Sequence, residues 1–198
     1  ENTIISAFGR VRFNVRDRYL VSASIRRDGA SVFAENNKYG VFPSVSAAWR
    51  ISEENFMQQF DCLSNLKIRG SWGESGNPAI RPYQSLLLGR AVNTSQGAGT
   101  GIVVGLAPTF PNANLKWETT YQYDAGLDVG LFEDRITLTF DAYLKRTQDL
   151  LTNVSLPLNS AFTEVTQNIG EVENKGIELG INSVNVQQGD FNWNTQFN

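Results

Sequence analysis

The sequence predicts an all-β protein, an antiparallel up-and-down transmembrane β-barrel, of which it supplies about eight strands. Apolar and polar residues alternate with a period of two along nearly the whole chain, as expected of strands between two different environments. One of the two alternating faces carries almost no charge over about ten residues, the length of a tilted membrane strand. Short and long connections also alternate, which is typical of outer-membrane barrels.

The composition excludes several classes of function. The chain has 198 residues, a net charge of −3, no histidine and one cysteine, Cys62. Without histidine there is no His-based catalytic triad and no common zinc site. Lys and Arg do not gather in one stretch, so nucleic acid is not an expected partner. We expect no cofactor, no metal ion and no enzymatic activity.

The strands follow from the alternation, element by element. They are expected at residues 5–16, 19–26, 45–51, 66–72, 121–131, 136–145, 177–182 and 191–197. In the first, Val11 and Phe13 share the apolar face, while Arg10 and Arg12 share the polar face. This division repeats in each later strand, so one face is expected to meet lipid and the other to line the lumen.

The connections set the orientation of the strands. Short ones are expected at Asp17–Arg18, 132–135 and 187–190, and long ones at 28–43, 74–114 and 147–170. Residues 52–65 belong with the short set and are expected to hold a helical turn around 53–60. Long loops lie outside the cell in such barrels. Aromatic residues near the strand ends are then expected at the two membrane interfaces: Tyr19, Trp49, Trp72, Trp117, Tyr121, Phe132 and Trp193.

Several stretches occur in an order that resembles one family. They are residues 24–31 (SIRRDGAS), 42–52 (FPSVSAAWRIS), 66–73 (LKIRGSWG), 114–120 (NLKWETT), 168–170 (NIG) and 174–178 (NKGIE). Together they resemble the SusC/RagA family of TonB-dependent outer-membrane transporters. Within this resemblance Gly29 suits a turn with positive φ, and Asn168, Gly170 and Gly176 suit a bend that re-enters the membrane.

The resemblance implies a larger assembly than the chain itself. It implies a barrel of about 22 strands in the bacterial outer membrane, with residues 1–198 as part of its wall. It also implies import of oligosaccharides or peptides, with a SusD/RagB-like surface lipoprotein as a lid and the TonB complex as the source of energy. The family's N-terminal plug domain matches nothing in this sequence.

The polar face carries the candidate chemistry. A hairpin turn at 132–135 pairs Leu131 with Ile136, so Gly126 faces Asp141, with Asp124 and Asp128 on the diagonals at about 7–8 Å. Such a spacing overlaps that of an inverting glycosidase. We expect instead lumen carboxylates that are solvated or paired with plug and wall cations such as Lys145.

A basic series shares this face: Arg10, Arg12, Arg16, Arg26, Lys67 and Arg69. It is expected to contact acidic groups of the plug, with steering of an anionic substrate as the alternative. Substrate contact is expected in the long loop at Arg81, Tyr83, Phe110 and Asn112, and on the wall at Asp141. Each loop residue could equally pack the loop. Residues 97–101 are expected to form a loop tip.

Two other classes remain open. A complete eight-stranded outer-membrane barrel acting as an anchor or adhesin fits the strand count. A soluble carbohydrate-binding β-sandwich or a glycosidase would fit the β-content, although sandwich strands are usually shorter, about 5–6 residues.

Overall fold

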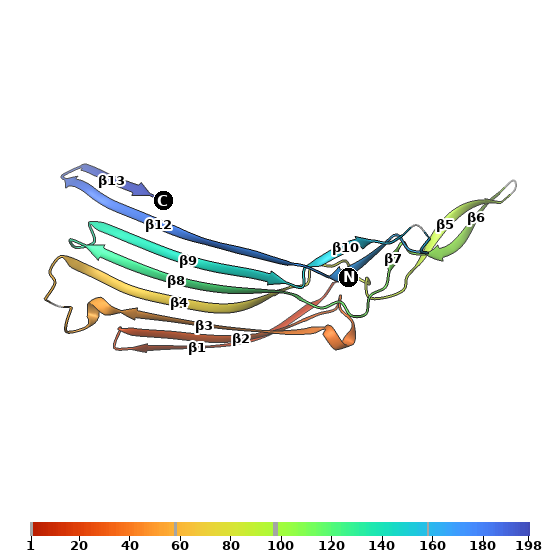
Figure 1. Ribbon diagram of the computed structural model, residues 1–198, viewed down its shortest axis with the longest axis horizontal. Coiled ribbons are helices and arrows are strands. Elements are labelled where there is room, and N and C mark those ends of the chain that lie inside the picture. The colour runs from red at the N-terminus through yellow and green to blue at the C-terminus, as the bar shows by residue number, and fades with distance from the viewer. Residues whose placement is uncertain (1, 58, 97–98, 158) are drawn as a thin grey trace.

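The computed structural model describes residues 2–57, 59–96, 99–157 and 159–198. Its main feature is one antiparallel sheet of eight long strands in the order β1-β2-β3-β4-β8-β9-β12-β13, curved along its length (Figure 1). These strands are β1 (Ile4–Val15), β2 (Tyr19–Ala30), β3 (Tyr39–Arg50), β4 (Leu63–Asn77), β8 (Glu118–Leu131), β9 (Ile136–Gln148), β12 (Glu171–Gln188) and β13 (Phe191–Phe197).

All eight predicted strands are present, and the all-β antiparallel prediction is confirmed. Most of them continue further toward the long loops than predicted. The long loop expected at 28–43 is wrong, because β2 runs on to Ala30 and β3 already begins at Tyr39. Beyond the apolar stretch both faces of a strand carry polar residues, so the alternation disappears while the backbone ladder continues.

The two longest predicted loops contain further strands. Residues 78–117 hold the hairpin of β5 (Gly89–Gln96) and β6 (Gly99–Leu106), and the short β7 (Thr109–Phe110). β7 joins β10 (Leu151–Ser155) and β11 (Glu164–Asn168) in a small second sheet. Of the predicted tip at 97–101, Gly97 and Ala98 lie outside the described residues, and Gly99 already belongs to β6.

The only helical elements in the described ranges are two 3₁₀ turns, η1 (Glu35–Asn37) and η2 (Ile51–Glu53). The helical turn expected around 53–60 is therefore displaced toward β3, and β-turns follow it. Within the described ranges, no helix is long and apolar enough to cross a membrane.

The large sheet is open. β1 and β13 form its two edges, and no ladder joins them in the described part of the chain. An eight-stranded barrel would need that ladder to close. The observed architecture is a curved wall, so the structure does not support a complete small barrel.

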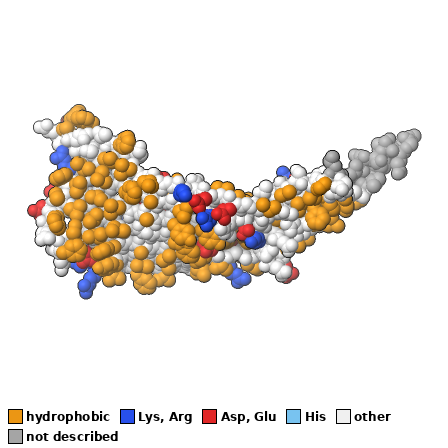
Figure 2. All heavy atoms as spheres, in the orientation of Figure 1, with side chains coloured by type: hydrophobic (Ala, Val, Ile, Leu, Met, Phe, Trp, Pro, Cys, Tyr) orange, Lys and Arg blue, Asp and Glu red, His pale blue; other side chains and the backbone are white. Residues whose placement is uncertain are grey.

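One face of the wall is apolar and uncovered. Val11, Phe13, Ile68, Phe140 and Ile177 all lie more than 40% exposed on it. Figure 2 shows hydrophobic side chains gathered in a broad band at the end of the sheet that bears the short turns. So large an exposed apolar face on a chain of this size marks contact with another apolar phase or protein.

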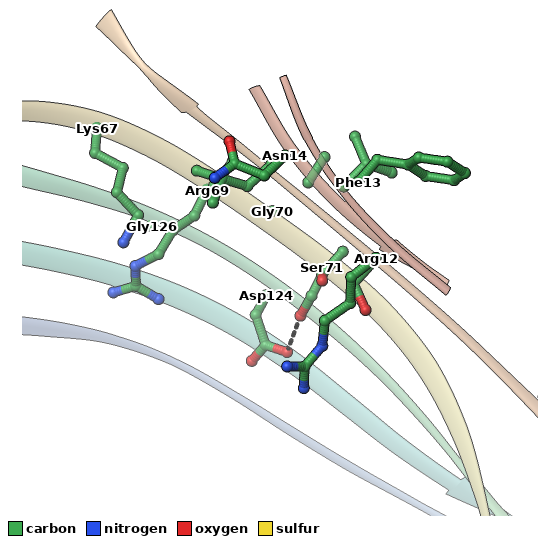
Figure 3. Close-up of a pocket in the computed structure, with 15 residues that line it drawn as sticks. Arg12, Phe13, Asn14, Lys67, Arg69, Gly70, Ser71, Asp124 and Gly126 are labelled. Atoms are coloured by element: carbon green, nitrogen blue, oxygen red, sulfur yellow. Dashed lines mark hydrogen bonds between the residues drawn. The ribbon is translucent and has the colours of Figure 1, made fainter. Parts of the chain in front are cut away.

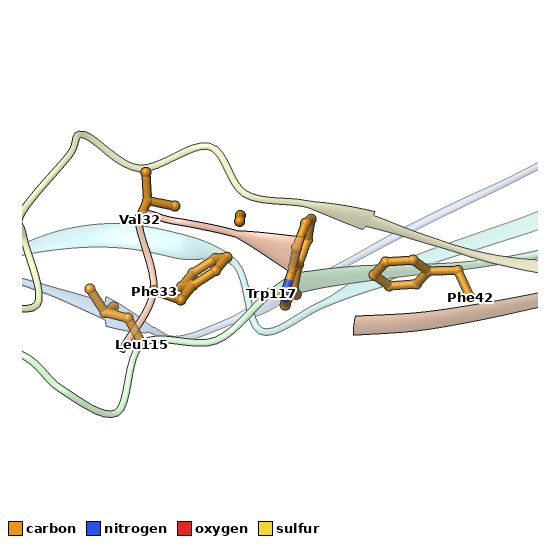
Figure 4. Packing of buried hydrophobic residues seen from close by; sticks show 6 residues of the cluster. Val32, Phe33, Phe42, Leu115 and Trp117 are labelled. Carbon is orange, nitrogen blue, oxygen red and sulfur yellow. The ribbon is translucent and has the colours of Figure 1, made fainter. Parts of the chain in front are cut away.

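Most of the few buried apolar side chains lie where β3 and β4 separate, and Val165 in β11 is buried apart from them. The β3–β4 ladder ends at Ser44 and Gly73, while β4 stays paired with β8 as far as Asn77. Phe42 and Trp117 pack edge to face in this gap, with ring centroids 5.5 Å apart, and Phe33 tilts against Trp117 at 5.3 Å (Figure 4). The cluster also contains Ala30, Val32 and Leu115.

This packing corrects the expectation for Trp117. Its side chain is only 7% exposed, and its indole Nε1 donates a hydrogen bond to the Lys38 carbonyl at 3.2 Å. Trp117 therefore holds loop segments together and does not lie in the interface band. An indole buries well only where its N–H finds an acceptor, and the β2–β3 loop supplies one here.

Glycines make room for the rings at this end of the sheet. A Cβ at Gly76 or Gly40 would lie 2.0 or 2.5 Å from the Phe42 ring, and one at Gly29 would lie 2.6 Å from the Tyr39 ring. The predicted positive φ at Gly29 is wrong, because Gly29 lies inside β2 and its role is close approach of an aromatic side chain. Gly170 does have a positive φ of 100°.

Candidate functional site

The polar face of the sheet is the candidate functional site. Ladder registers place Arg12, Ser22, Ser46, Ser71 and Asp124 opposite one another on five successive strands. Residues directly opposite in a ladder share a face, so small serines separate a basic edge from an acidic one. Figure 3 shows Arg12, Ser71, Asp124, Lys67 and Arg69 projecting from the same side of the wall, with Ser71 Oγ donating to Asp124 at 3.0 Å.

Two acidic residues of the wall, Asp128 and Asp141, are paired with basic ones, while Asp124 accepts hydrogen bonds from Ser71 and Gln122. Arg69 lies between two carboxylates, 2.6 Å from Asp141 and 3.3 Å from Asp128, and Lys67 lies 3.1 Å from Asp128. The predicted pairing of Gly126 with Asp141 is confirmed. A Cβ at Gly126 would lie 2.5 Å from Arg69 Cζ, so this glycine lets the guanidinium cross β8 to reach β9.

The expected partner cation was different. Lys145 was expected to pair with these carboxylates, but Arg69 and Lys67 hold them. Lys145 stands opposite Gln122 on β8, in another row of the face. An arginine side chain is long enough to reach across the neighbouring strand when the residue between it and its partner is glycine. The pairing of opposite residues in the ladder does not by itself predict such a contact.

The basic series divides into three groups. Lys67 and Arg69 pair with carboxylates of the wall itself, and contact of the series with an acidic plug stays a prediction. Arg26 pairs through Nε with the buried Asp28 at 2.7 Å. Arg10 and Arg12 have no carboxylate within 4 Å in the described chain, and Arg16 lies in the β1–β2 turn.

Three hollows lie along this face. One of about 410 Å³ is lined by Arg12, Ser46 and Asp124 among others, and one of about 530 Å³ by Arg10, Ser24 and Gln122 among others. A third, of about 390 Å³, contains Phe8 and Arg26. Together they follow the basic edge of the wall from its middle toward the long loops.

The loop candidates have unequal surroundings. Asn112 is engaged in structure, since its Nδ2 donates to the Thr166 carbonyl at 2.9 Å and its Oδ1 accepts from Asn114 N at 3.0 Å. Phe110 packs edge to face on Phe162 at 5.1 Å. Arg81 and Tyr83 line a separate hollow of about 150 Å³ next to the β5–β6 hairpin. The fifth candidate, Asp141, lies in β9 on the wall and takes part in none of these loop contacts.

At the short-turn end, Tyr19 and Trp49 stack with ring centroids 6.2 Å apart. Glu54 accepts hydrogen bonds from the Tyr19 hydroxyl at 2.7 Å and from the Trp49 indole at 3.2 Å, and pairs with Arg18 at 2.9 Å. These bonds, that from Tyr19 first, hold the pKa of Glu54 below its ordinary value. Glu54 could not be predicted from sequence patterns, because its partners lie more than thirty residues away or across a turn.

Among the other expected interface aromatics, Trp72, Tyr121 and Trp193 lie in strands and face outward by register, while Phe132 lies in the β8–β9 turn. Phe132 and Trp193 are more than half exposed near the short turns. Trp72 and Tyr121 are half-buried on the outer face, toward the long loops. Beyond them Arg146 pairs with Glu171 at 3.2 Å and Glu173 at 2.8 Å. This charged group marks the limit of the apolar band on β9 and β12.

Comparisons with known proteins agree with this architecture. Residues 1–198 match the family model described as TonB dependent receptor-like, beta-barrel. The chain is 45% identical over its whole length to TonB-dependent receptor P3 of Formosa agariphila, and 39% identical to TonB-dependent receptor SusC of Bacteroides thetaiotaomicron. It covers 20% of each, and so spans about a fifth of the length of these relatives.

Solved structures give the same result. The RagAB peptide importer in its closed-closed state superimposes with a TM-score of 0.84 at 29% identity, over 98% of this chain and 22% of that chain. The siderophore receptor PirA from Pseudomonas aeruginosa superimposes with a TM-score of 0.61 at 15% identity, over 98% of this chain and 33% of that one. The second likeness concerns the fold alone. The chain belongs to the TonB-dependent receptor family and forms part of the wall of an outer-membrane β-barrel, with SusC and RagAB among the proteins that it resembles.

Proposed function

We propose that the receptor containing this chain actively imports nutrient oligosaccharides or peptides across the outer membrane. The observation that carries this proposal is similarity along the whole chain to both SusC and the RagAB peptide importer. The wall has the two surfaces that an importer needs, an apolar one toward lipid and a charged, hollowed one toward the lumen. In this proposal residues 1–198 supply wall and extracellular loops.

The remaining parts of the machine lie outside residues 1–198. We propose a barrel of about 22 strands, an N-terminal plug domain within it, and coupling to the TonB complex through that domain. A SusD/RagB-like surface lipoprotein is the proposed partner at the extracellular end. Support comes from the naming of the relatives and from the fraction of their length, about a fifth, that the chain covers.

We propose transport without catalysis. If the protein were a glycosidase, Asp141 would be its candidate catalytic carboxylate. This carboxylate forms an ion pair with Arg69 at 2.6 Å. Both of its carboxylate oxygens are therefore engaged by the guanidinium of the wall itself. Purified full-length receptor is therefore expected to leave oligosaccharides and peptides uncleaved.

A deletion strain tests the proposal. The strain lacking the full-length receptor is grown on single carbon sources, namely a set of defined oligosaccharides and a set of peptides, beside wild type. Loss of growth on one source, restored by the receptor and not by a receptor with an inactivated TonB-contacting segment, is the expected result. Equal growth of both strains on every source, with equal uptake of labelled probes, would contradict it.

A further inference from the structure

The basic edge of the lumenal face, on β1, differs from the rest of that face because its positive charges are not paired with carboxylates. The carboxylates of β8 and β9 neutralise Lys67 and Arg69. Arg10 and Arg12 stand two residues apart on the same face of β1, and no described carboxylate pairs with either. Two unpaired guanidiniums on one strand create a local positive potential inside a barrel lumen.

An exposed aromatic ring adjoins this charge. Phe8 shares the polar face with Arg10 and stands opposite Arg26 in the β1–β2 ladder. It lies on the edge strand of the sheet, where it is 79% exposed within residues 1–198. An exposed phenyl ring costs free energy unless a ligand or neighbour covers it. Phe8, Arg10 and Arg26 line one hollow of about 390 Å³, together with Ser24, Ser44 and Phe42. Glu74 also lines it, although alternation in β4 directs its side chain to the other face.

Arg26 is held in place from beneath. Asp28 is 3% exposed and accepts from Arg26 Nε at 2.7 Å. Its second oxygen, Oδ1, is buried without a partner in the described chain. The carboxylate of Asp28 therefore binds Nε of the Arg26 guanidinium. The two terminal nitrogens of Arg26 make no hydrogen bond in the described chain, so they are available to an acceptor on a ligand.

The hollow lies at the loop end of the wall. Arg27 is the first charged residue on the outer face of β2, where its guanidinium covers the Tyr39 ring at 4.4 Å. Arg26 and Phe8 therefore sit level with the edge of the apolar band, at the side of the long loops. A substrate entering from outside would meet this part of the wall before the interior.

We propose that Phe8, Arg10 and Arg26 form a subsite for an acidic substrate unit, which carries a carboxylate or sulfate group beside an apolar face. The ring of Phe8 covers the apolar face, and the two guanidiniums hold the oxyanion in the fork geometry that suits it. Arg12 continues the path toward the interior. Asp28 is a positioning residue. This inference rests on the proposed import function and adds the class of cargo.

The test uses full-length receptor purified in detergent, at low ionic strength because salt screens such contacts. Four probes are titrated: an oligogalacturonide, a sulfated carrageenan oligosaccharide, a hexaglutamate peptide and neutral maltohexaose. We expect at least one acidic probe to bind more tightly than maltohexaose, and the identity of that probe distinguishes glycan from peptide cargo. The double substitution Arg10→Gln and Arg26→Gln should weaken it by a factor of about 10 to 100.

Matched variants separate this role from others. Arg27→Gln removes the adjacent guanidinium on the opposite face and should leave binding of the acidic probe unchanged. Phe8→Ala should weaken that probe, and by less than the double substitution. Unchanged binding in the double variant would overturn the subsite. A lowered melting temperature with unchanged probe binding would also overturn it, and would assign the arginines to contact with an interior domain.

Failure of the subsite differs from failure of import. A receptor that takes up neutral oligosaccharide or peptide but prefers no acidic probe would keep the proposed function and remove the subsite. A deletion strain that loses uptake of no probe at all would remove the proposed function itself.

Discussion

The guanidinium of Arg69 on β4 lies 2.6 Å from the carboxylate of Asp141 on β9, although β8 runs between those two strands. Gly126 makes the contact possible, because it leaves the lumenal surface of β8 bare at that point. The side chain of Arg69 thus spans three strands of the wall. Because the charges of Arg69 and Asp141 neutralise each other, neither is fully available to a substrate in the lumen.

Substitution of Gly126 should break this contact. In Gly126→Ala the new Cβ would lie 2.5 Å from Arg69 Cζ and 2.6 Å from Asp141 Oδ1, so both side chains must move apart. We expect a loss of about 1–3 kcal/mol in the unfolding free energy of the full-length receptor in liposomes. Gly70→Ala is the control, since its Cβ would meet only the Asp124 carbonyl at 3.8 Å. Equal effects of the two substitutions would remove the role given to Gly126.

The Trp117 cluster should fix the extracellular loops. Trp117→Ala deletes a ring that is 7% exposed and packs against both Phe33 and Phe42. Truncation of such a core aromatic costs about 3–5 kcal/mol locally. Protease added to whole cells should then cut segments 31–38 and 112–117 faster than in wild type. Trp193→Ala, at an exposed position, should leave the cleavage pattern as it was; faster cleavage there as well would argue against a local lock.

Glu54 should make the short-turn end sensitive to acid. Its pKa is lowered in the folded state, first by the hydrogen bond from Tyr19. The stabilisation is therefore present above the ordinary carboxyl pKa and is lost as pH falls through the lowered folded-state value. The unfolding free energy, measured between neutral and strongly acidic pH, should be larger for wild type than for Glu54→Gln at neutral pH only. A gap between the two that stays constant with pH would mean that charge on Glu54 contributes nothing.

Two adjacent residues of β12 should respond oppositely to charge. Ile177 is 71% exposed on the apolar face, and Glu178 faces Asp141 on the polar face. Ile177→Arg places a cation toward lipid and should cost up to about 2–4 kcal/mol, depending on its depth in the membrane. Glu178→Arg sets a cation beside a carboxylate and should be tolerated. Unfolding from liposomes measures both, and equal costs would contradict the assignment of faces.

The strands of the wall could largely be predicted, because the two faces of a membrane strand meet different environments and its residues therefore alternate between apolar and polar. The Gly126–Asp141 register followed from the β8–β9 turn alone. The reach of Arg69 did not, because it depends on a missing side chain on a third strand. Trp117 was misplaced since an aromatic residue near a strand end looks the same whether it faces lipid or fills the gap between β3 and β4. Strands β5, β6, β7, β10 and β11 were missed because no apolar alternation marks the paired backbone in the long loops.

The two faces of β12 should meet different surroundings, lipid at Ile177 and Leu179 and the aqueous lumen at Glu178 and Gly180. Single-cysteine labelling of these four positions, in full-length receptor with Cys62→Ser and within outer membranes, measures this difference. A small membrane-impermeant maleimide should label the cysteines at 178 and 180. Those at 177 and 179 should resist it and react with a lipid-soluble maleimide. Labelling of all four by the impermeant reagent to the same extent would contradict the account.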